Sequence, residues 1–466
     1  MRWLECVYGL LWGPPGVAVM MGTGLFLSLR TGFPQITLLP GAFRMLSVPK
    51  EKKGTVTQFQ ALCTALAATV GTGNIIGVSG AICLGGPGAI FWMWLCGFLG
   101  MATKFAEVTL ARRYRDFSGG EMVGGPMYMI RKGMPGKWHF LAYLYSAFGV
   151  IAAFGVGNAT QVNAVVSGFH DILASHGREP TWMGTLLVGI VMALAVGAVL
   201  FGGVKRIGGA AEKIVPAVSV GYILLCLWVL VKCRRQIPGA FAAILKGAVS
   251  PGAVTGGMIG SAFVSLRTGC ARGIFTNEAG MGTASMAYAA AGEGHPVELG
   301  LLGLLEVFMD TIVICTLTAM AVLCGGAAIP YGVDAGGVLP FRVFSDVCGS
   351  WAAGALTLFL SVFAFATVLG WGLYGARCGQ FLFGPGFWKT FVWLQMGGVL
   401  LGALLETRTL WLAAELVNGL MAVPNLIALT ALSPELCRLV REYKKKYLRF
   451  EDKKAIMKKK REKGKP

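Results

Sequence analysis

The chain has 466 residues, of which 55% are hydrophobic and only 14% are charged, and its formal net charge is +19. So large an apolar share with so little charge excludes an ordinary soluble domain and favours an all-α polytopic membrane protein. The basic excess does not indicate nucleic acid binding, because much of it lies in the tail and in loops beside apolar segments, where it can face anionic lipid headgroups.

Apolar runs of about 20 residues recur along the chain, and a run of this length crosses a bilayer core of roughly 30 Å. We predict spans over residues 9–29, 58–84, 88–111, 140–168, 182–203, 212–231, 256–285, 297–324, 350–376, 387–405 and 409–432. The first is interpreted as a genuine span and not as a secretory signal, because Arg30 follows it where a small-residue cleavage site would be expected.

Basic residues cluster in a C-terminal tail over residues 433–466, which includes the runs 444–446 and 458–461. The positive-inside rule therefore predicts a cytoplasmic C-terminus, and an odd number of spans places the N-terminus on the other side. Basic loops at 30–53, 112–137, 205–213 and 377–389 agree with this orientation, whereas the cluster at 232–235 would lie outside. We expect a multi-pass protein of a bacterial cell membrane.

The span at 58–84 is interrupted by Gly71-Thr72-Gly73-Asn74. Unpaired backbone groups in hydrocarbon cost several kcal/mol each, so a broken helix persists only where it faces protein, water or a bound solute. The half-helix after Gly73 would direct its N–H groups at a carboxylate, and the carbonyls released before it suit a small cation. The alternative is that the glycines only allow close helix packing, which does not require a buried Asn74.

A second Gly-rich interruption lies between Gly256 and Gly282, where Ser265–Gly273 breaks the apolar pattern. Paired broken helices in two halves are typical of an inverted-repeat secondary transporter. We therefore predict an N-terminal helix and connector at 1–57, a first five-helix repeat at 58–231, an extracellular connector at 232–255, a second repeat at 256–432 and the tail at 433–466.

Several long stretches resemble the alanine/glycine:cation symporter family, also called sodium:alanine symporters. The resemblance is carried by Val70–Gly77, Gly85–Trp94, Met101–Val108, Gly124–Tyr128 and Arg272–Gly282. It implies a LeuT-type fold, with ten helices in two inverted five-helix repeats and one additional N-terminal helix, about 11 spans in total.

The resemblance also implies a substrate site. Its residues would be Gly71, Thr72, Gly73, Asn74, Gln161, Ile274, Phe275, Thr276, Thr367 and Trp371. Thr367 and Trp371 lie one helical turn apart on a single face. There the indole would cap a small pocket with little room beyond a methyl group.

A Na⁺ site is implied as well, between the carbonyls of Ala67 and Val70, the carbonyl of Phe363 and the hydroxyl of Thr367. At the position of Thr367, many relatives of this fold have two adjacent hydroxyl residues, whereas this chain has Ala366 beside Thr367. The coordination number therefore stays open.

Acidic residues inside spans are costly and suggest function. Asp310, with Glu306 on the same face, either fixes packing through neighbouring donors or takes part in transport, and a proton-coupling role is the weaker form of the second option. We interpret Lys104 and Glu107, three positions apart, as an exposed structural pair near the cytoplasmic end, with a gating role as the alternative. Glu278 is expected at a cytoplasmic gate or helix end, because its charge would repel a substrate carboxylate.

The leading hypothesis is co-transport of alanine or glycine with Na⁺ by alternating access. The alternatives are H⁺ coupling, a broader range of amino acids, or a non-transporting sensor derived from this fold. A channel would need a continuous polar lining, and no catalytic constellation indicates an enzyme. The 12 cysteines and four histidines lack metal-site spacing, so no cofactor and no metal beyond Na⁺ is expected. The expected partners are the amino acid, Na⁺ and the lipid bilayer, and the oligomeric state is not predicted.

Overall fold

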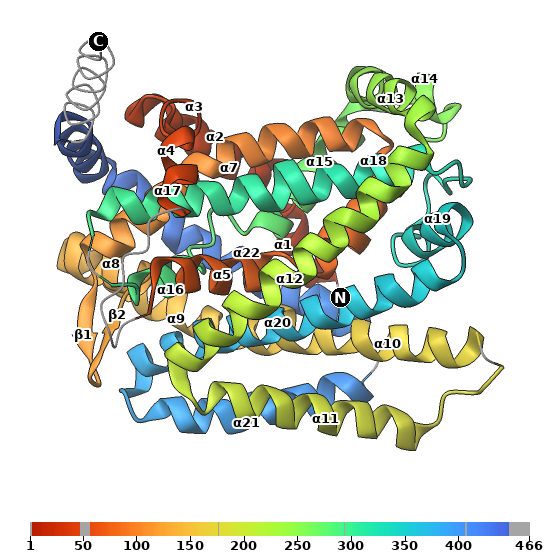
Figure 1. Ribbon diagram of the computed structural model, residues 1–466. Coiled ribbons are helices and arrows are strands. Elements are labelled where there is room, and N and C mark those ends of the chain that lie inside the picture. Colours follow the sequence, from red (N-terminus) through yellow and green to blue (C-terminus); the bar gives the residue numbers. More distant parts are fainter. Residues whose placement is uncertain (1, 47–55, 176, 293, 406–407, 447–466) are drawn as a thin grey trace, which may run out of the picture.

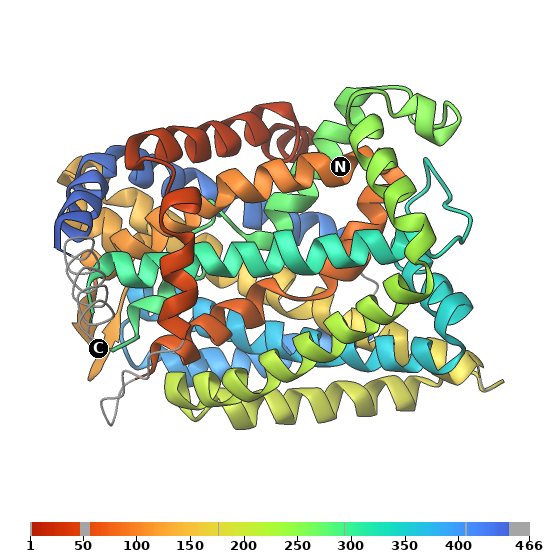
Figure 2. The same ribbon diagram turned by 45° about the horizontal axis from the view of Figure 1, so that its top comes forward.

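The structure, a computed structural model, describes residues 2–46, 56–175, 177–292, 294–405 and 408–446. Long helices run alongside one another over most of the molecule (Figures 1 and 2). Within the described ranges nine helices are long and apolar enough to cross a membrane, and a further pair of helices, bent by 52° at a break, makes a tenth candidate. This is the architecture of a multi-pass membrane protein.

The first part of the chain up to the middle contains α1 (Arg2–Leu11), α2 (Pro14–Thr31), α3 (Pro34–Thr37), α4 (Leu39–Leu46), α5 (Gln58–Thr69), η1 (Gly73–Gly77), α6 (Val78–Gly85), α7 (Gly88–Arg113), β1 (Asp116–Ser118), β2 (Glu121–Val123), α8 (Pro126–Gly133), η2 (Gly136–Trp138), α9 (Phe140–Phe154), η3 (Gly155–Ala159), α10 (Thr160–Ser175), α11 (Trp182–Leu200) and α12 (Gly203–Lys232). The second part contains η4 (Arg234–Gln236), α13 (Ile237–Val249), α14 (Gly252–Thr255), α15 (Ala262–Asn277), α16 (Ser285–Ala289), α17 (Pro296–Val307), η5 (Phe308–Cys315), α18 (Thr316–Cys324), α19 (Leu339–Cys348), α20 (Trp351–Phe383), α21 (Phe387–Leu404) and α22 (Arg408–Ala431). A last helical segment covers 433–446, and the basic run at 458–461 lies outside the described residues.

The predicted first span is two helices. α1 ends at Leu11 and α2 starts at Pro14, a residue suited to the first turn because no N–H is needed there. Gly13 lies at the bend, where an added Cβ would come within 1.9 Å of the Gly9 carbonyl oxygen. The Gly-Pro-Pro sequence therefore interrupts the helix, while Cys6–Thr31 as a whole still forms one candidate span.

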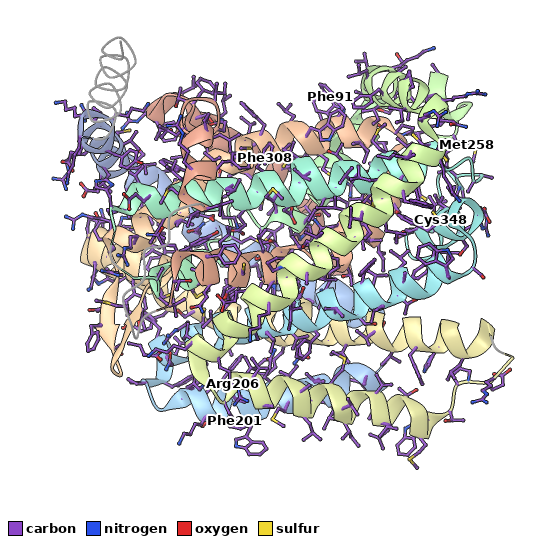
Figure 3. The ribbon with its side chains drawn as sticks, in the orientation of Figure 1. Phe91, Phe201, Arg206, Met258, Phe308 and Cys348 are labelled. Atoms are coloured by element: carbon purple, nitrogen blue, oxygen red, sulfur yellow. The ribbon has the colours of Figure 1, made fainter. Side chains whose placement is uncertain are left out.

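The bundle has two distinct ends. The β1–β2 hairpin lies at one end with α8, and the end of α11 near Phe201 and Arg206 is on the same side (Figures 1 and 3). The opposite end carries α13, α14 and α19, with Met258 and Cys348 (Figure 3). Helix α13 lies in the predicted connector 232–255, and α19 lies between two predicted spans of the second repeat. Both helices are too short to give a span-length apolar run.

Small residues bring α17 and α15 close to the central helix α7. A Cβ added to Gly300 of α17 would lie 2.1 Å from Thr109 Oγ1, and one added to Gly303 would lie 2.7 Å from Val108. Contacts this close are possible only without side chains at the crossing points, as in other small-residue membrane interfaces. The three helices form the frame on which the second break is held.

The second discontinuity lies later than predicted. α15 is helical throughout Ser265–Gly273, so the break predicted within that stretch is wrong. Its glycines serve packing instead: a Cβ on Gly269 would lie 2.1 Å from the Ala89 carbonyl oxygen of α7. The helix ends at Asn277, Glu278 follows it with a positive φ of 52°, and the next helix begins at Ser285.

Candidate functional site

The first broken helix is held open by side chains. In an uninterrupted helix the Gly71 N–H would donate to the Ala67 carbonyl, four residues earlier. It donates instead to Asn74 Oδ1 at 2.8 Å, and Val70 before it is extended, with ψ of 104°. The Ala67 carbonyl accepts a 3.0 Å hydrogen bond from the Thr367 hydroxyl of α20. The predicted break at Gly71–Asn74 is confirmed.

Asn74 also ties this break to η5. Its Nδ2 donates to Asp310 Oδ1 at 2.7 Å, while Asp310 Oδ2 accepts from the Thr311 hydroxyl at 2.9 Å. All three side chains are fully buried. Because a buried carboxylate needs such donors, this geometry favours the interpretation in which Asp310 fixes packing around the break.

Two of the four residues expected to hold a cation are in direct contact. Thr367 and Ala67 are in direct hydrogen-bond contact, and Val70 and Phe363 belong to one buried cluster between the break and α20. In secondary transporters, carbonyl oxygens of unwound helix segments coordinate Na⁺. The residue types at this position therefore fit the ion.

A cavity of about 420 Å³ lies beside the break. Its wall includes four of the predicted substrate residues: Thr72, Gly73, Phe275 and Thr276. An added Cβ on Gly73 would lie 3.8 Å from the Thr276 side chain, so the two broken elements approach each other at this point. Hydroxyl groups beside an aromatic ring are the mixed lining of a small-molecule site.

Gln161 and Gly71 form a layer behind that wall. Gln161 Oε1 accepts from the Thr72 hydroxyl at 3.2 Å, and its Nε2 donates to the Val156 carbonyl at 3.2 Å. A Cβ on Gly71 would lie 2.9 Å from Thr367 Oγ1 and 3.8 Å from Gln161 Oε1. These residues therefore orient the lining and do not themselves face the cavity.

Two predicted pocket residues lie elsewhere. Ile274 lines a separate small pocket together with Met20 of α2 and Cys96 of α7. Trp371 is fully buried against Gly157, and its indole N–H donates to Glu278 Oε1 at 3.0 Å. The expectation that this indole closes the pocket is therefore corrected for the cavity described here, because the ring anchors the second break instead.

Three charged residues on the cavity wall were missed from the sequence. Arg272 of α15 lies 3.4 Å from Glu415 of α22, and Asp334 comes from the loop between α18 and α19. The Tyr8 hydroxyl donates to Glu415 Oε2 at 2.8 Å. Glu415 could have been recognised as an acid inside a predicted span, whereas no local pattern marks Asp334. Together the three offer both signs of charge to a solute entering the cavity.

The predicted ion pair of Lys104 has a different partner. Lys104 Nζ lies 3.4 Å from Glu306 Oε1 of α17, and both side chains are fully buried, so the expected exposed pair with Glu107 is wrong. Glu306 Oε2 accepts from the Tyr288 hydroxyl at 3.0 Å. Lys104 Nζ also lies 3.4 Å from the carbonyl oxygen of Glu278, at the end of α15. The charge of Lys104 thus links α7 and α17 to the second break.

Glu107 holds the chain beyond that break. Its Oε1 accepts from the N–H groups of Gly280 and Gly282, at 2.8 and 3.1 Å, and from Asn425 Nδ2 at 2.8 Å. Glu278 Oε2 accepts from the Thr283 hydroxyl at 2.6 Å. The unwound segment after α15 is therefore fixed by buried carboxylates, which supports the helix-end interpretation of Glu278.

Comparison with known proteins gives a family for this arrangement. The model of the Sodium:alanine symporter family matches residues 1–458. The chain is 42% identical over 441 residues to the sodium/alanine symporter AgcS of Methanococcus maripaludis, which covers 92% of this chain and 94% of that protein. It is 35% identical over 443 residues to the probable sodium/glutamine symporter GlnT of Bacillus subtilis, and this alignment covers 93% of this chain and 88% of that protein.

Among solved structures, the crystal structure of MhsT in complex with L-phenylalanine superposes with a TM-score of 0.55 at 15% sequence identity. The match covers 84% of this chain and 99% of that one. The likeness confirms the predicted LeuT-type fold. The described residues give nine or ten candidate spans, so the predicted number of 11 stays a prediction.

Proposed function

Because this chain belongs to the sodium:alanine symporter family, a family of transporters and not of enzymes, we propose that it carries alanine or glycine across the membrane together with Na⁺. The site would open alternately to either side of the bilayer, with the two broken helices as its moving parts. We also propose that residues 58–231 and 256–432 form its two inverted repeats.

The observation that carries the proposal is the redirected hydrogen bond of Gly71. Its N–H donates to Asn74 at 2.8 Å, so the Ala67 carbonyl is released from the helix ladder. A released carbonyl beside the Thr367 hydroxyl suits Na⁺, and the nearby start of η1 at Gly73 suits a carboxylate. One break therefore supports the binding of both Na⁺ and the carboxylate of the amino acid.

The amino acid would lie in the 420 Å³ cavity. We expect its carboxylate near Thr72 and Gly73 and its side chain against Phe275. Arg272 and the acids Asp334 and Glu415, on the same wall, would attract the two charges of a zwitterion as it enters. Under the predicted orientation, with the C-terminus in the cytoplasm, this entrance faces the extracellular side.

For Na⁺ we propose Ala67, Val70, Phe363 and Thr367. In the structure the Thr367 hydroxyl donates to the Ala67 carbonyl. On Na⁺ binding that hydroxyl would turn its lone pair to the ion, and the same two residues would then be bridged through the ion. Binding of Na⁺ would in this way draw α20 and the break into one defined geometry.

The test is uptake of radiolabelled alanine and glycine into proteoliposomes with an imposed Na⁺ or H⁺ gradient. We expect saturable accumulation that follows the inward Na⁺ gradient and disappears when Na⁺ is replaced by choline. Uptake that follows neither gradient would reject the proposal. Accumulation against a concentration gradient also separates a carrier from a passive pore.

Proton coupling is a second candidate, favoured by the buried acids around Lys104. Lys104 pairs with Glu306, while Glu107 and Glu278 lie close by without a second cation in direct contact among the described residues. Such a cluster could exchange a proton during the transport cycle. Uptake driven by an inward H⁺ gradient in the absence of Na⁺ would support this candidate over the first.

A further inference from the structure

An apolar groove follows the contact between α2 and α22 on the outside of the bundle. Its volume is about 590 Å³, and its wall includes Val19 and Met20 of α2 and Val423 and Ile427 of α22. Val19 is 58% exposed and Val423 is 46% exposed, and both lie in helices that are long and apolar enough to cross a membrane. The groove is therefore open to the hydrocarbon of the bilayer.

A second hollow lies where these two helices end. It has a volume of about 400 Å³ and is lined by three cationic side chains, Arg30 at the end of α2 and Arg441 and Lys444 of the segment 433–446. Cys437 of this segment approaches the Arg30 carbonyl oxygen at 3.2 Å, which joins the two walls. In Figure 2 the C-terminal blue segment lies beside the end of the dark red helix α2.

The groove and the hollow lie on one continuous face. On α22 the groove is lined at 419, 422, 423, 426, 427, 430 and 431, and the lining of the hollow continues at 434, 437, 440, 441 and 444. These positions follow the three- and four-residue spacing of a single helix face. The helix ladder also continues through the turn, because Leu432 donates to Ala428 and Leu436 donates to Leu432.

The three cations are available to an anionic ligand. Within the described part of the chain, neither arginine nor the lysine has a carboxylate within 4 Å, and Arg30 lies over the ring of Phe26, with 5.6 Å between the guanidinium carbon and the ring centroid. The two acids of the same segment face other arginines: Glu435 pairs with Arg113 and Arg438, and Glu442 lies 3.8 Å from Arg438. The hollow therefore has a net positive charge that no described carboxylate compensates.

We propose that the groove and the hollow together bind one anionic phospholipid. Its phosphate would lie among Arg30, Arg441 and Lys444, and an acyl chain would lie in the groove between α2 and α22. The groove positions on α22 run from Gly419 to Ala431, a rise of about 18 Å along the helix. This is close to the thickness of roughly 15 Å that one leaflet contributes to the hydrocarbon core. Basic pockets between membrane helices at the interface are known headgroup sites. A free phosphate would use the hollow and leave the groove empty.

The experiment uses the full-length protein purified in detergent and native mass spectrometry with phosphatidylglycerol or phosphatidylcholine of the same chains. We expect one phosphatidylglycerol per chain to be retained in preference to phosphatidylcholine. The double variant Arg30→Gln/Arg441→Gln should lower its affinity by about five-fold or more for each cation removed. Arg438→Gln is the matched control, because this arginine is on the same segment but is paired with Glu435 and lies outside the hollow.

A second variant tests the groove independently of charge. Val423→Trp fills it from an exposed position, so the fold is expected to persist, and retention of phosphatidylglycerol should fall as in the double arginine variant. Thermal unfolding with added inorganic phosphate separates the two ligand sources, and we expect phosphate alone to give no stabilisation.

Three results would overturn the proposal: equal retention of both lipids, unchanged retention in Val423→Trp, or stabilisation by phosphate equal to that by the lipid. A lipid-independent dimer in the mass spectra that Val423→Trp disrupts would assign the groove to a second copy of the chain and would also overturn it. Each readout is independent of transport, so the outcome does not depend on the function proposed above.

Discussion

The Asn74 amide and the Asp310 carboxylate, 236 positions apart in the sequence, share a 2.7 Å hydrogen bond that joins the first broken helix to η5. The same Asn74 side chain accepts from the Gly71 N–H. One buried amide therefore fixes both the local unwinding and its place against the second half of the chain. This contact explains why an asparagine follows the glycines in a segment that is otherwise apolar.

If Asp310 acts by positioning Asn74, its shape matters more than its charge. Asp310→Asn keeps an acceptor for Asn74, so Na⁺-dependent alanine uptake should persist. Asp310→Ala leaves the buried Asn74 amide without that acceptor, at a cost of about 1–3 kcal/mol, and uptake should fall at least about ten-fold. Uptake and thermal unfolding of both variants measure this. Loss of uptake in a well-folded Asp310→Asn would show instead that the charge itself is needed.

Thr367→Val should weaken Na⁺ binding, because valine has the shape of threonine without the hydroxyl that meets the Ala67 carbonyl. We expect the Na⁺ concentration for half-maximal uptake to rise by about ten-fold, equivalent to about 1.4 kcal/mol. Thr367→Ser, which keeps the hydroxyl, is the control and should behave like the natural protein. An unchanged Na⁺ dependence in Thr367→Val would remove Thr367 from the proposed cation site.

Two glycines of the same break should respond differently to alanine. A Cβ at Gly71 would lie 2.9 Å from Thr367 Oγ1, whereas a Cβ at Gly73 would lie no closer than 3.8 Å to the Thr276 side chain. Gly71→Ala should therefore disturb the cation site and abolish most uptake. Gly73→Ala should fold normally and mainly raise the alanine concentration needed for half-maximal uptake. The reverse order of effects would contradict the arrangement of this site.

The buried ion pair gives a prediction on stability. Lys104→Met leaves the Glu306 carboxylate buried without its cation. The free energy of unfolding should therefore fall by about 3–5 kcal/mol. Adding Glu306→Gln removes the stranded charge and should restore much of this loss. Thermal unfolding in detergent compares the two variants. A double variant no more stable than Lys104→Met alone would argue against a direct interaction between these residues.

Selectivity for small side chains should depend on Phe275 more than on Trp371, because only Phe275 lies on the cavity wall. Phe275→Ala should let larger neutral amino acids compete with alanine uptake. Trp371→Phe should lower the uptake rate through the lost hydrogen bond to Glu278, with little change in the order of competitors. Competition assays with a series of neutral amino acids test both. If the order of competing amino acids changed only in Trp371→Phe, the indole of Trp371 would have to contact the substrate.

The first break could be predicted because Gly71 and Asn74 stand out in an apolar segment, where each has a recognisable cost. The second could not be located in the same way. Ser265–Gly273 looks interrupted in sequence, yet Gly269 is there to let α15 approach Ala89 of α7. The actual discontinuity begins at Glu278, where the chain turns into positive φ and is held by contacts from distant helices.

The same limit applies to the cavity. Thr72, Gly73, Phe275 and Thr276 could be placed by resemblance, because short motifs carry them. The cavity wall also includes Arg272, Asp334 and Glu415, which come from three separate parts of the chain. No spacing in the sequence predicts that they line the same cavity. The partner of Lys104 was missed for the same reason, because Glu306 is distant in sequence and Glu107 is near.

The central claim is that Na⁺ and the amino acid bind together at the first break and so strengthen each other. Equilibrium binding of alanine to the purified protein, measured in Na⁺ and in choline at equal ionic strength, tests it most directly. The account predicts a higher alanine affinity in Na⁺ and, by linkage, an equal factor in Na⁺ affinity when alanine is present. Alanine affinity that is the same in both salts would contradict it.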